Sequence, residues 1–200
     1  MQSSIRIRVR AGDEAAFGVL FAEHGRAVYN HCFRLTGDWS TAEDCTSVVF
    51  LEAWRLRAKV APEGGSLLPW LLGIAHRVVH RPRRAAARHR ALLERIPEPG
   101  PLPDFADEVV GRLADQERIA AVRAVLRRLS RADREVIQLC VWAGLDYPGA
   151  AEALGVPVGT VRSRLSRARR RLQRLVEEAE PADGRRVPLP VARADGGERR

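Results

Sequence analysis

Apolar residues recur at spacings of three and four along most of the chain, which is the period of an amphipathic helix. In the first predicted helix they are Phe17, Leu20, Phe21, His24, Val28, Cys32 and Leu35. Gly37 marks the end of this helix. The pattern then resumes and reaches Trp54, with Ser40 or Thr41 as the expected N-cap of a second helix.

A third helix is expected over 67–80, where Pro69 is compatible with a helix only in its first turn. Residues 97–108 contain four prolines and four acidic residues, a composition typical of a linker. No segment shows the alternation of a strand, so we expect an all-α fold of two small helical domains joined by this Pro- and acid-rich linker. The expected boundaries are 12–95 for the first domain, 96–112 for the linker, 113–178 for the second domain and 179–200 for a disordered tail.

The second half carries clear signals for helix ends. Ser130 and Asp133 form a capping pattern before a helix that Gly144 terminates. Asp146 is the expected N-cap of a short helix that ends at Gly155. The last helix is long, and its apolar residues form one stripe at steps of four and three: Val161, Leu165, Ala168, Leu172 and Leu175.

A short helix, a glycine turn and a second helix with a polar face predict a helix-turn-helix. Six arginines lie within residues 162–171 and occupy the part of the last helix that the apolar stripe leaves free. In this motif the N-terminal part of the second helix meets base edges in the major groove. The candidate DNA-binding residues are Thr160, Arg162, Ser163, Arg164, Ser166 and Arg167. The alternative is a solvated basic helix of a bundle.

The charge of the whole chain favours a polyanionic partner, because the formal net charge is +9. Nucleic acid and an anionic membrane surface both fit this balance. Residues 76–90 form a second basic patch with six arginines, three histidines and no acid, and Trp70 precedes it. Such a patch suits a nucleic-acid strand, through phosphate contacts and base stacking, although a solvated basic face beside a core tryptophan would look the same. The candidates in this patch are Trp70, His76, Arg77, His80, Arg81 and Arg84.

The first half also carries an acidic edge, formed by Glu43, Asp44 and Glu52 beside Trp39 and Trp54. In an otherwise basic chain this edge is a candidate face for docking another protein. A solvated helix surface is the alternative.

Several kinds of function have no support in the sequence. Cys32, Cys45 and Cys140 are far apart and form no metal-binding or CxxC spacing, so we expect buried thiols in a reducing cytosol. No phosphate-binding glycine motif and no nucleophile–base pattern is found, and His24 and His31 are expected in the core. We therefore expect no cofactor, no metal, no small-molecule substrate and no enzymatic activity. No signal peptide or membrane-length apolar run is found, so we expect a cytoplasmic protein without membrane insertion.

The motifs of both halves resemble those of one family, the extracytoplasmic-function (ECF, group 4) sigma factors of the sigma-70 family. The second half is similar to sigma region 4 in "REVIQL", "GLDYPGAAEALG" and "VPVGTVRSRLSRARRRL". The first half is similar to region 2 in "TGDWSTAEDCTSVVFLEAWR" and "LLPWLLGIAHRVV". The resemblance covers roughly residues 12–178.

The resemblance implies a subunit that binds core RNA polymerase and directs it to promoters. Region 2 would melt and capture the −10 element through the patch that begins at Trp70, and the helix-turn-helix would read the −35 element. The polymerase-binding residues that the resemblance implies are Glu43, Asp44, Phe50 and Trp54. An anti-sigma factor would be a further partner. The main alternative is a helix-turn-helix transcriptional regulator that binds duplex DNA without polymerase, and a helical enzyme is a weaker one.

Overall fold

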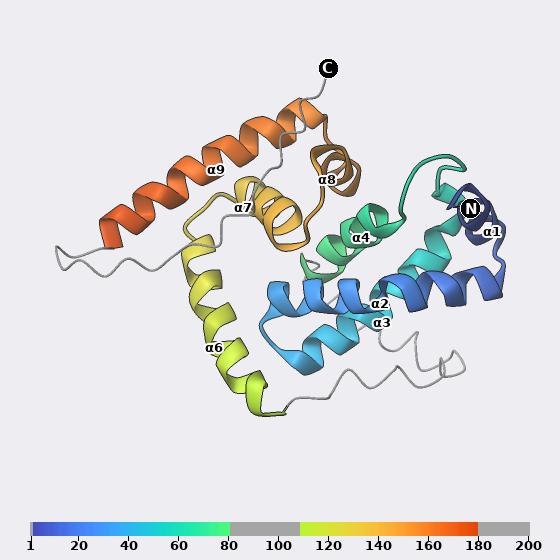
Figure 1. The fold of residues 1–200 in the computed structure, drawn as a ribbon, viewed down its shortest axis with the longest axis horizontal. Helices are drawn as coiled ribbons and strands as arrows, with labels where there is room; N and C mark the ends of the chain where they lie inside the picture. The colour runs from blue at the N-terminus through green and yellow to red at the C-terminus, as the bar shows by residue number, and fades with distance from the viewer. Residues whose placement is uncertain (1, 81–108, 180–200) are drawn as a thin grey trace, which may run out of the picture.

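The structure is a computed structural model that describes residues 2–80 and 109–179, and every regular element in these two ranges is a helix (Figure 1). The first range contains α1 (Gln2–Ala11), α2 (Glu14–Thr36), α3 (Trp39–Leu56), the short 3-10 helix η1 (Arg57–Lys59) and α4 (Leu68–His80). The second contains α6 (Val109–Leu126), α7 (Arg131–Ile137), the π-helical turn η2 (Gln138–Trp142), α8 (Tyr147–Leu154) and α9 (Val158–Ala179). The all-α prediction is confirmed. Residues 96–108 of the predicted linker and 180–200 of the predicted tail lie outside the described residues, as do Arg81 and Arg84. The last four linker residues, 109–112, belong to the first turn of α6, and residue 179 is the last of α9.

Most of the predicted helix ends are found, but the N-cap of α3 is not the expected one. Gly37 has a φ of 73° and closes α2 as predicted. The cap of α3 is Asp38, whose carboxylate accepts the N–H of Thr41 at 2.7 Å. Asp38 has the extended backbone that a cap needs, whereas Ser40 and Thr41 already lie inside the helix. The expectation of Ser40 or Thr41 was therefore wrong.

The helix α1 was not among the predicted elements, because its apolar residues alternate with arginines instead of following a helical period. The helix buries Arg6, which is only 3% exposed, and leaves Ile7 on the surface. The Arg6 guanidinium donates to carbonyl oxygens of the loop 61–66, including that of Gly65 at 2.7 Å. A buried cation is tolerated only when its donors are satisfied in this way, so tertiary contacts decide this element.

The first half packs α2, α3 and α4 around one core. Leu20 and Val28 of α2, Val49 of α3 and Leu71 of α4 are all at most 2% exposed. Burying each side chain of this kind contributes about 1.5–3 kcal/mol. These contacts fix the direction of α4, which carries residues 76–80 of the second basic patch.

The second half packs α7 and α8 against the apolar stripe of α9. Of the predicted stripe, Leu172 is half-buried and the others are buried: Val161, Leu165, Ala168 and Leu175. The predicted caps are also present, because Ser130 Oγ accepts the N–H of Asp133 at 3.1 Å and Asp146 accepts that of Gly149 at 2.7 Å. The stripe therefore turns the arginines of α9 away from the core, as the spacing predicts.

The two halves are in contact, since α4 lies against α8 (Figure 1). The backbones approach closely at Gly73, where an added Cβ would lie 2.5 Å from the carbonyl oxygen of Ala153. Two arginines also cross the junction, because Arg34 donates to the carbonyl of Trp142 and Arg123 to that of Thr36.

Candidate nucleic-acid interface

The helices α8 and α9 form the predicted helix-turn-helix. Gly155 ends α8 in the left-handed region, with a φ of 65°. Only Val156 and Pro157 separate it from α9, whose first turn is set by a hydrogen bond from Thr160 N–H to the Pro157 carbonyl at 2.9 Å. Pro157 lacks an N–H and fits just before a helix start, where none is needed. The turn thus presents the N-terminal half of α9 beside α8.

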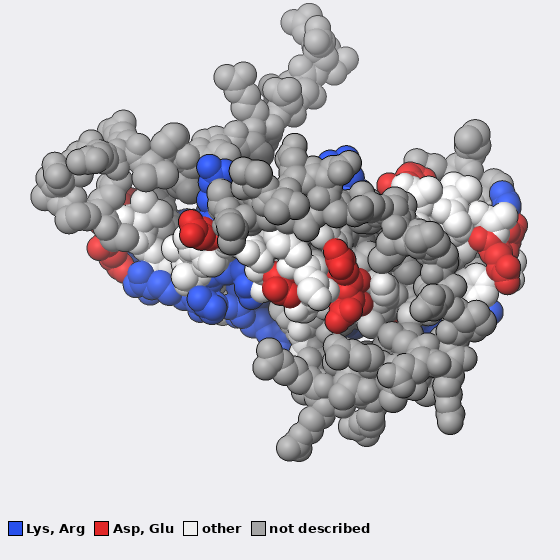
Figure 2. All heavy atoms as spheres, turned by 90° about the horizontal axis from the view of Figure 1, so that it is seen from below, with Lys and Arg blue, Asp and Glu red and all other residues white. Residues whose placement is uncertain are grey.

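The surface of α9 away from its apolar stripe is polar and basic. Four of the six predicted −35 residues are exposed and two, Thr160 and Arg164, are half-buried. The exposed four are Arg162, Ser163, Ser166 and Arg167. Further along α9, Arg169, Arg170 and Arg174 are exposed as well. Figure 2 shows Lys and Arg side chains gathered in one continuous band on this side of the molecule. Such a band raises the local potential for a polyanion.

Three side chains at the N-terminal end of this surface have defined partners. Ser163 Oγ donates to the carbonyl of Thr160 at 3.0 Å. The Arg162 guanidinium lies 5.8 Å from the ring centre of Tyr147, within the range of a cation–π contact. The Nε of Arg167 lies 3.2 and 3.3 Å from the two carboxylate oxygens of Asp133 on α7.

The helix α4 carries the predicted −10 residues that the structure describes, and it places them in different environments. Arg77 is exposed, whereas Trp70 and His80 are half-buried. His76 is only 5% exposed and lies against His31 of α2, with 3.2 Å between His31 Nε2 and His76 Nδ1. In this arrangement protein covers the His76 ring, so the ring does not belong to the accessible part of the patch.

The histidines of α4 also add no positive charge to the patch near neutral pH. Burial, followed by the neighbouring His80, lowers the pKa of His76 to about 4. Burial, followed by Arg131 of α7, lowers the pKa of His80 as well. A neutral imidazole is not attracted to phosphate by its charge, so in this patch the arginines supply the electrostatic attraction to a nucleic-acid backbone.

The predicted polymerase-binding residues of α3 are divided between surface and core. Glu43 and Asp44 are exposed. Phe50 is 6% exposed, and its ring lies 4.7 Å from that of Phe21 between ring centres. Trp54 is half-buried, and the Arg57 guanidinium lies 4.4 Å above its ring. Two exposed acids and a half-buried tryptophan therefore lie on this part of α3.

The other members of the predicted acidic edge lie inward. Glu52 is 6% exposed and accepts from Arg55 at 3.1 Å, so it is a paired buried acid and not a surface one. Trp39 stacks on Phe33 with 3.7 Å between ring centres. The exposed acidic face is consequently smaller than the sequence suggests.

Comparisons with known proteins agree with this arrangement. The family model for sigma-70 region 2 matches residues 20–89, and the model for sigma-70 region 4 matches residues 119–172. The ECF RNA polymerase sigma factor SigK of Mycolicibacterium vanbaalenii is 34% identical over 161 residues, which cover 79% of this chain and 80% of that protein. SigK of Mycobacterium tuberculosis is 30% identical over 172 residues, or 85% of this chain and 90% of that protein.

The chain is an ECF RNA polymerase sigma factor of the sigma-70 family.

Two solved structures share the fold of this sigma factor. One is CnrH in complex with the cytosolic domain of CnrY, with a TM-score of 0.64, 24% identity, and coverage of 89% of this chain and 98% of that one. The other is RpoE in complex with the anti-sigma factor NepR from Bartonella quintana, with a TM-score of 0.52, 24% identity, and coverage of 82% and 98%. At this identity they confirm the fold of the sigma factor alone.

The two family matches include all the predicted site residues of this sigma factor. The region 4 match spans α7, α8 and most of α9, with the six candidates for the −35 element. The region 2 match spans most of α2 and all of α3 and α4, with the candidates for the −10 element and for polymerase. Sequence reasoning did not find that Asp133 and Tyr147 contact the arginines of α9. The spacing of Ser130 and Asp133 predicts only a helix cap, because a contact with a residue 34 positions away leaves no local pattern.

The described histidines and cysteines of the sigma factor are buried or half-buried. His24 and His31 are buried as predicted, at 7% and 2% exposure. The three cysteines are free thiols, and burial raises the pKa of Cys32 to about 12. Cys45 and Cys140 are only half-buried, so the expectation of buried thiols is correct for Cys32 and wrong for the other two. Within residues 2–80 and 109–179, no group of His, Cys, Asp and Glu is arranged to hold a metal ion. In the same part of the chain, no helix has the length and apolar character to cross a membrane.

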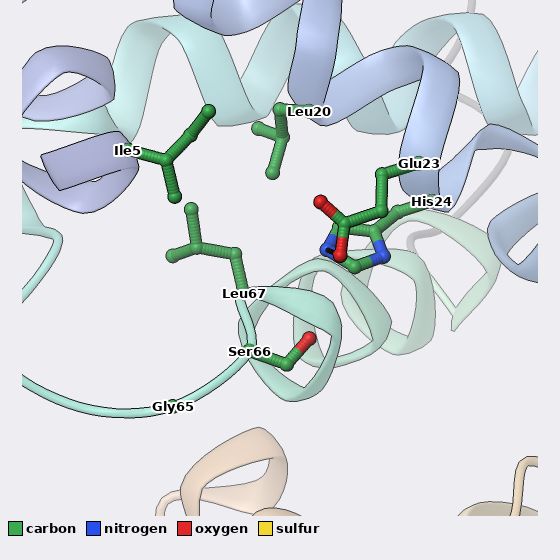
Figure 3. A pocket seen from close by; sticks show the side chains of 7 residues that line it. All are labelled: Ile5, Leu20, Glu23, His24, Gly65, Ser66 and Leu67. Carbon is green, nitrogen blue, oxygen red and sulfur yellow. Dashed lines mark ion pairs between the residues drawn. The ribbon is translucent and has the colours of Figure 1, made fainter. Parts of the chain in front are cut away.

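A small pocket lies between α1, α2 and the loop before α4 (Figure 3). Its lining residues are Ile5, Leu20, Glu23, His24, Gly65, Ser66 and Leu67. The Nε2 of His24 lies 3.7 Å from the carboxylate of Glu23. Ser66 Oγ accepts the N–H of Leu68 at 3.1 Å, in the turn that leads into α4. None of the lining residues belongs to the three predicted binding surfaces.

Proposed function

We propose that this sigma factor reads the −35 element through the exposed N-terminal half of α9. The proposed residues are Thr160, Arg162, Ser163, Arg164, Ser166 and Arg167. The observation that supports this most strongly is the exposure of Arg162 and Arg167 in the N-terminal half of α9, while Val161 and Leu165 fix the opposite face in the core. A helix held in this way can enter a major groove without unpacking.

We further propose that α4 and the basic segment after it capture the −10 strand. The proposed residues are Trp70, His76, Arg77, His80, Arg81 and Arg84. Arg77 and the exposed part of Trp70 are accessible in the described arrangement, and they offer a cation and a stacking surface. His76 would need to leave its contact with the His31 ring of α2 before it could meet a base.

Core RNA polymerase is the proposed partner of α3, through Glu43, Asp44, Phe50 and Trp54. The acids offer exposed charge, and the buried Phe50 would act by supporting the surface on which Trp54 lies. We propose an anti-sigma factor as a second protein partner, because the relative RpoE is seen in complex with the anti-sigma factor NepR.

These partners suggest a place of action and a domain division. The protein would act in the cytoplasm, where polymerase and promoters are, and would perform no catalysis of its own. We propose domains at 12–95 and 113–178, a linker at 96–112 and a tail at 179–200. The polymerase would supply all the chemistry of transcription.

Run-off transcription tests this function. Purified core polymerase and the full chain are mixed with a library of promoters whose −35 and −10 positions are randomised, and the templates that give transcripts are sequenced. We expect two short sequence elements to emerge, and none with core polymerase alone. Specific binding of duplex promoter DNA by the chain alone, with no stimulation of transcription, would contradict the proposal.

A further inference from the structure

Arg167 is held by a residue from another helix. Its Nε lies 3.2 Å from Oδ1 and 3.3 Å from Oδ2 of Asp133 on α7. Asp133 is 8% exposed, and its backbone N–H donates to Ser130 Oγ, so the residue is held in the first turn of α7 and its carboxylate has little free space. Among the six proposed −35 residues, Arg167 is the one for which the described part of the chain shows an ion pair.

The contact uses only the inner nitrogen of the guanidinium. Arginine has one N–H on Nε and two on each terminal nitrogen. The Arg167 side chain is 59% exposed although its inner nitrogen is held. The two terminal amino groups are therefore left to a ligand at the surface, and their spacing matches the O6 and N7 acceptors of guanine.

The Asp133–Arg167 ion pair is explained less well by a role in the stability of the fold than by a role in holding the guanidinium for a ligand. An ion pair with an exposed arginine contributes little to stability, because water screens it. Holding the guanidinium in place before DNA binds lowers the entropy cost of binding, because a free arginine loses much side-chain entropy when a base fixes it. Arg162 offers a contrast, because its contact is with the Tyr147 ring and leaves its hydrogen-bonding nitrogens unfixed.

We propose that Asp133 is a positioning residue for promoter recognition, which holds Arg167 so that its terminal amino groups read a guanine of the −35 element. The proposal rests on the function proposed above for α9. Asp133 itself need not touch DNA. It selects one orientation of the guanidinium out of the several that a solvated arginine samples.

The test is run-off transcription with core polymerase on a promoter that the library identifies, with each −35 base pair replaced in turn. Asp133→Asn keeps the size of the side chain and removes its charge. We expect this variant to lose the preference for guanine at one position by about tenfold, and to transcribe templates that lack that guanine almost as the parent does. Arg167→Ala should lose the same preference at the same position, and the double variant should lose no more than Arg167→Ala alone.

Two further variants separate positioning from folding. Arg167→Lys leaves Asp133 in place and keeps the charge, but it lacks the planar fork, so the same guanine preference should fall. Arg171→Ala removes an arginine that lies 3.9 Å from Glu178 at the far end of α9, and it should leave every base preference unchanged.

Other outcomes would overturn the assignment. Equal losses on all −35 sequences would show that Arg167 meets phosphate or that Asp133 only supports the fold. An unchanged or stronger guanine preference in Asp133→Asn would show that the pair is unrelated to reading or restrains it. Either result would overturn the positioning role while leaving the sigma function intact. Absence of promoter-dependent transcription with the unmodified chain would overturn both.

Discussion

His31 Nε2 and His76 Nδ1 lie 3.2 Å apart, and this contact joins α2 to α4 in the core. Both rings are buried, at 2% and 5% exposure. The charged groups that face them from other positions are Arg34, Arg131 and Glu135. One ring must donate and the other accept, so the pair holds a single proton between the two nitrogens and is neutral.

This pair should make the stability of the sigma factor depend on pH. Burial lowers the pKa of His31 to about 3 and that of His76 to about 4, while an unfolded histidine titrates near its ordinary value of about 6.5. Between about pH 6.5 and pH 4 the unfolded chain therefore binds more protons, and stability falls as the pH falls. We expect His31 and His76 each to lower the free energy of unfolding by about 1–2 kcal/mol at pH 5 relative to pH 7.5. Urea unfolding at the two pH values measures this difference.

The variant His76→Gln provides the control for this prediction. It removes one titrating group from the junction, so the loss of stability between pH 7.5 and pH 5 should become smaller. An equally steep loss in the variant would show that other groups cause the pH dependence.

Replacing Gly73, where α4 approaches α8 closely, and Gly18, which has open space around it, should have opposite effects on stability. In Gly73→Ala the new Cβ would lie 2.5 Å from the carbonyl oxygen of Ala153, and backbone cannot move as cheaply as a side chain. We expect a loss of about 1–3 kcal/mol in the free energy of unfolding. Gly18→Ala, on the exposed side of α2 with open space around it, should gain about 0.5–1 kcal/mol.

Urea unfolding of both variants at neutral pH compares these effects directly. Stabilisation by Gly73→Ala would show that the two halves are not packed closely in solution. Scattering measurements on the same samples would report whether the halves have separated.

Arg170 should act on promoter affinity and not on sequence choice. It is exposed on α9, beyond the residues that we propose for base contacts. If it meets a phosphate, Arg170→Ala should weaken binding of the polymerase complex to all promoters by a similar factor and reduce the slope of log affinity against log salt by about 1. Filter binding at several salt concentrations measures both quantities. A change of preferred −35 sequence would instead make Arg170 a base-reading residue.

Asp44 should contribute to polymerase binding. It is an exposed acid on α3, in the face that we propose for docking. Asp44→Ala should slow the association with core polymerase and weaken it by up to about 1 kcal/mol, since an exposed charge at an interface acts mainly on the rate of encounter. The matched control is Glu63→Ala, an exposed acid of the loop before α4 that lies outside this face. Fluorescence anisotropy with labelled sigma factor measures both affinities, and equal values would remove Asp44 from the interface.

Much of the fold and part of the site follow from local patterns. The stripe from Val161 to Leu175 predicts both the helix α9 and the side on which its arginines lie, because a helical period needs only the residues along one segment. The caps at Ser130 and Asp146 are local in the same sense, since donor and acceptor lie three residues apart. The motifs of both halves also carry the family resemblance that the comparisons confirm.

The tertiary structure decided what lies between segments. Asp133 and Arg167 are 34 positions apart, and His31 and His76 are 45 apart, so no spacing in the sequence brings them together. The helix α1 likewise exists because distant carbonyl groups satisfy Arg6, against its own alternating pattern. Apart from α1, local patterns in the sequence predicted the main helices and the faces they bury. Packing determined which charges meet. The partner that a side chain finds on another helix depends on how the two helices pack, and not on the residues next to it in the chain.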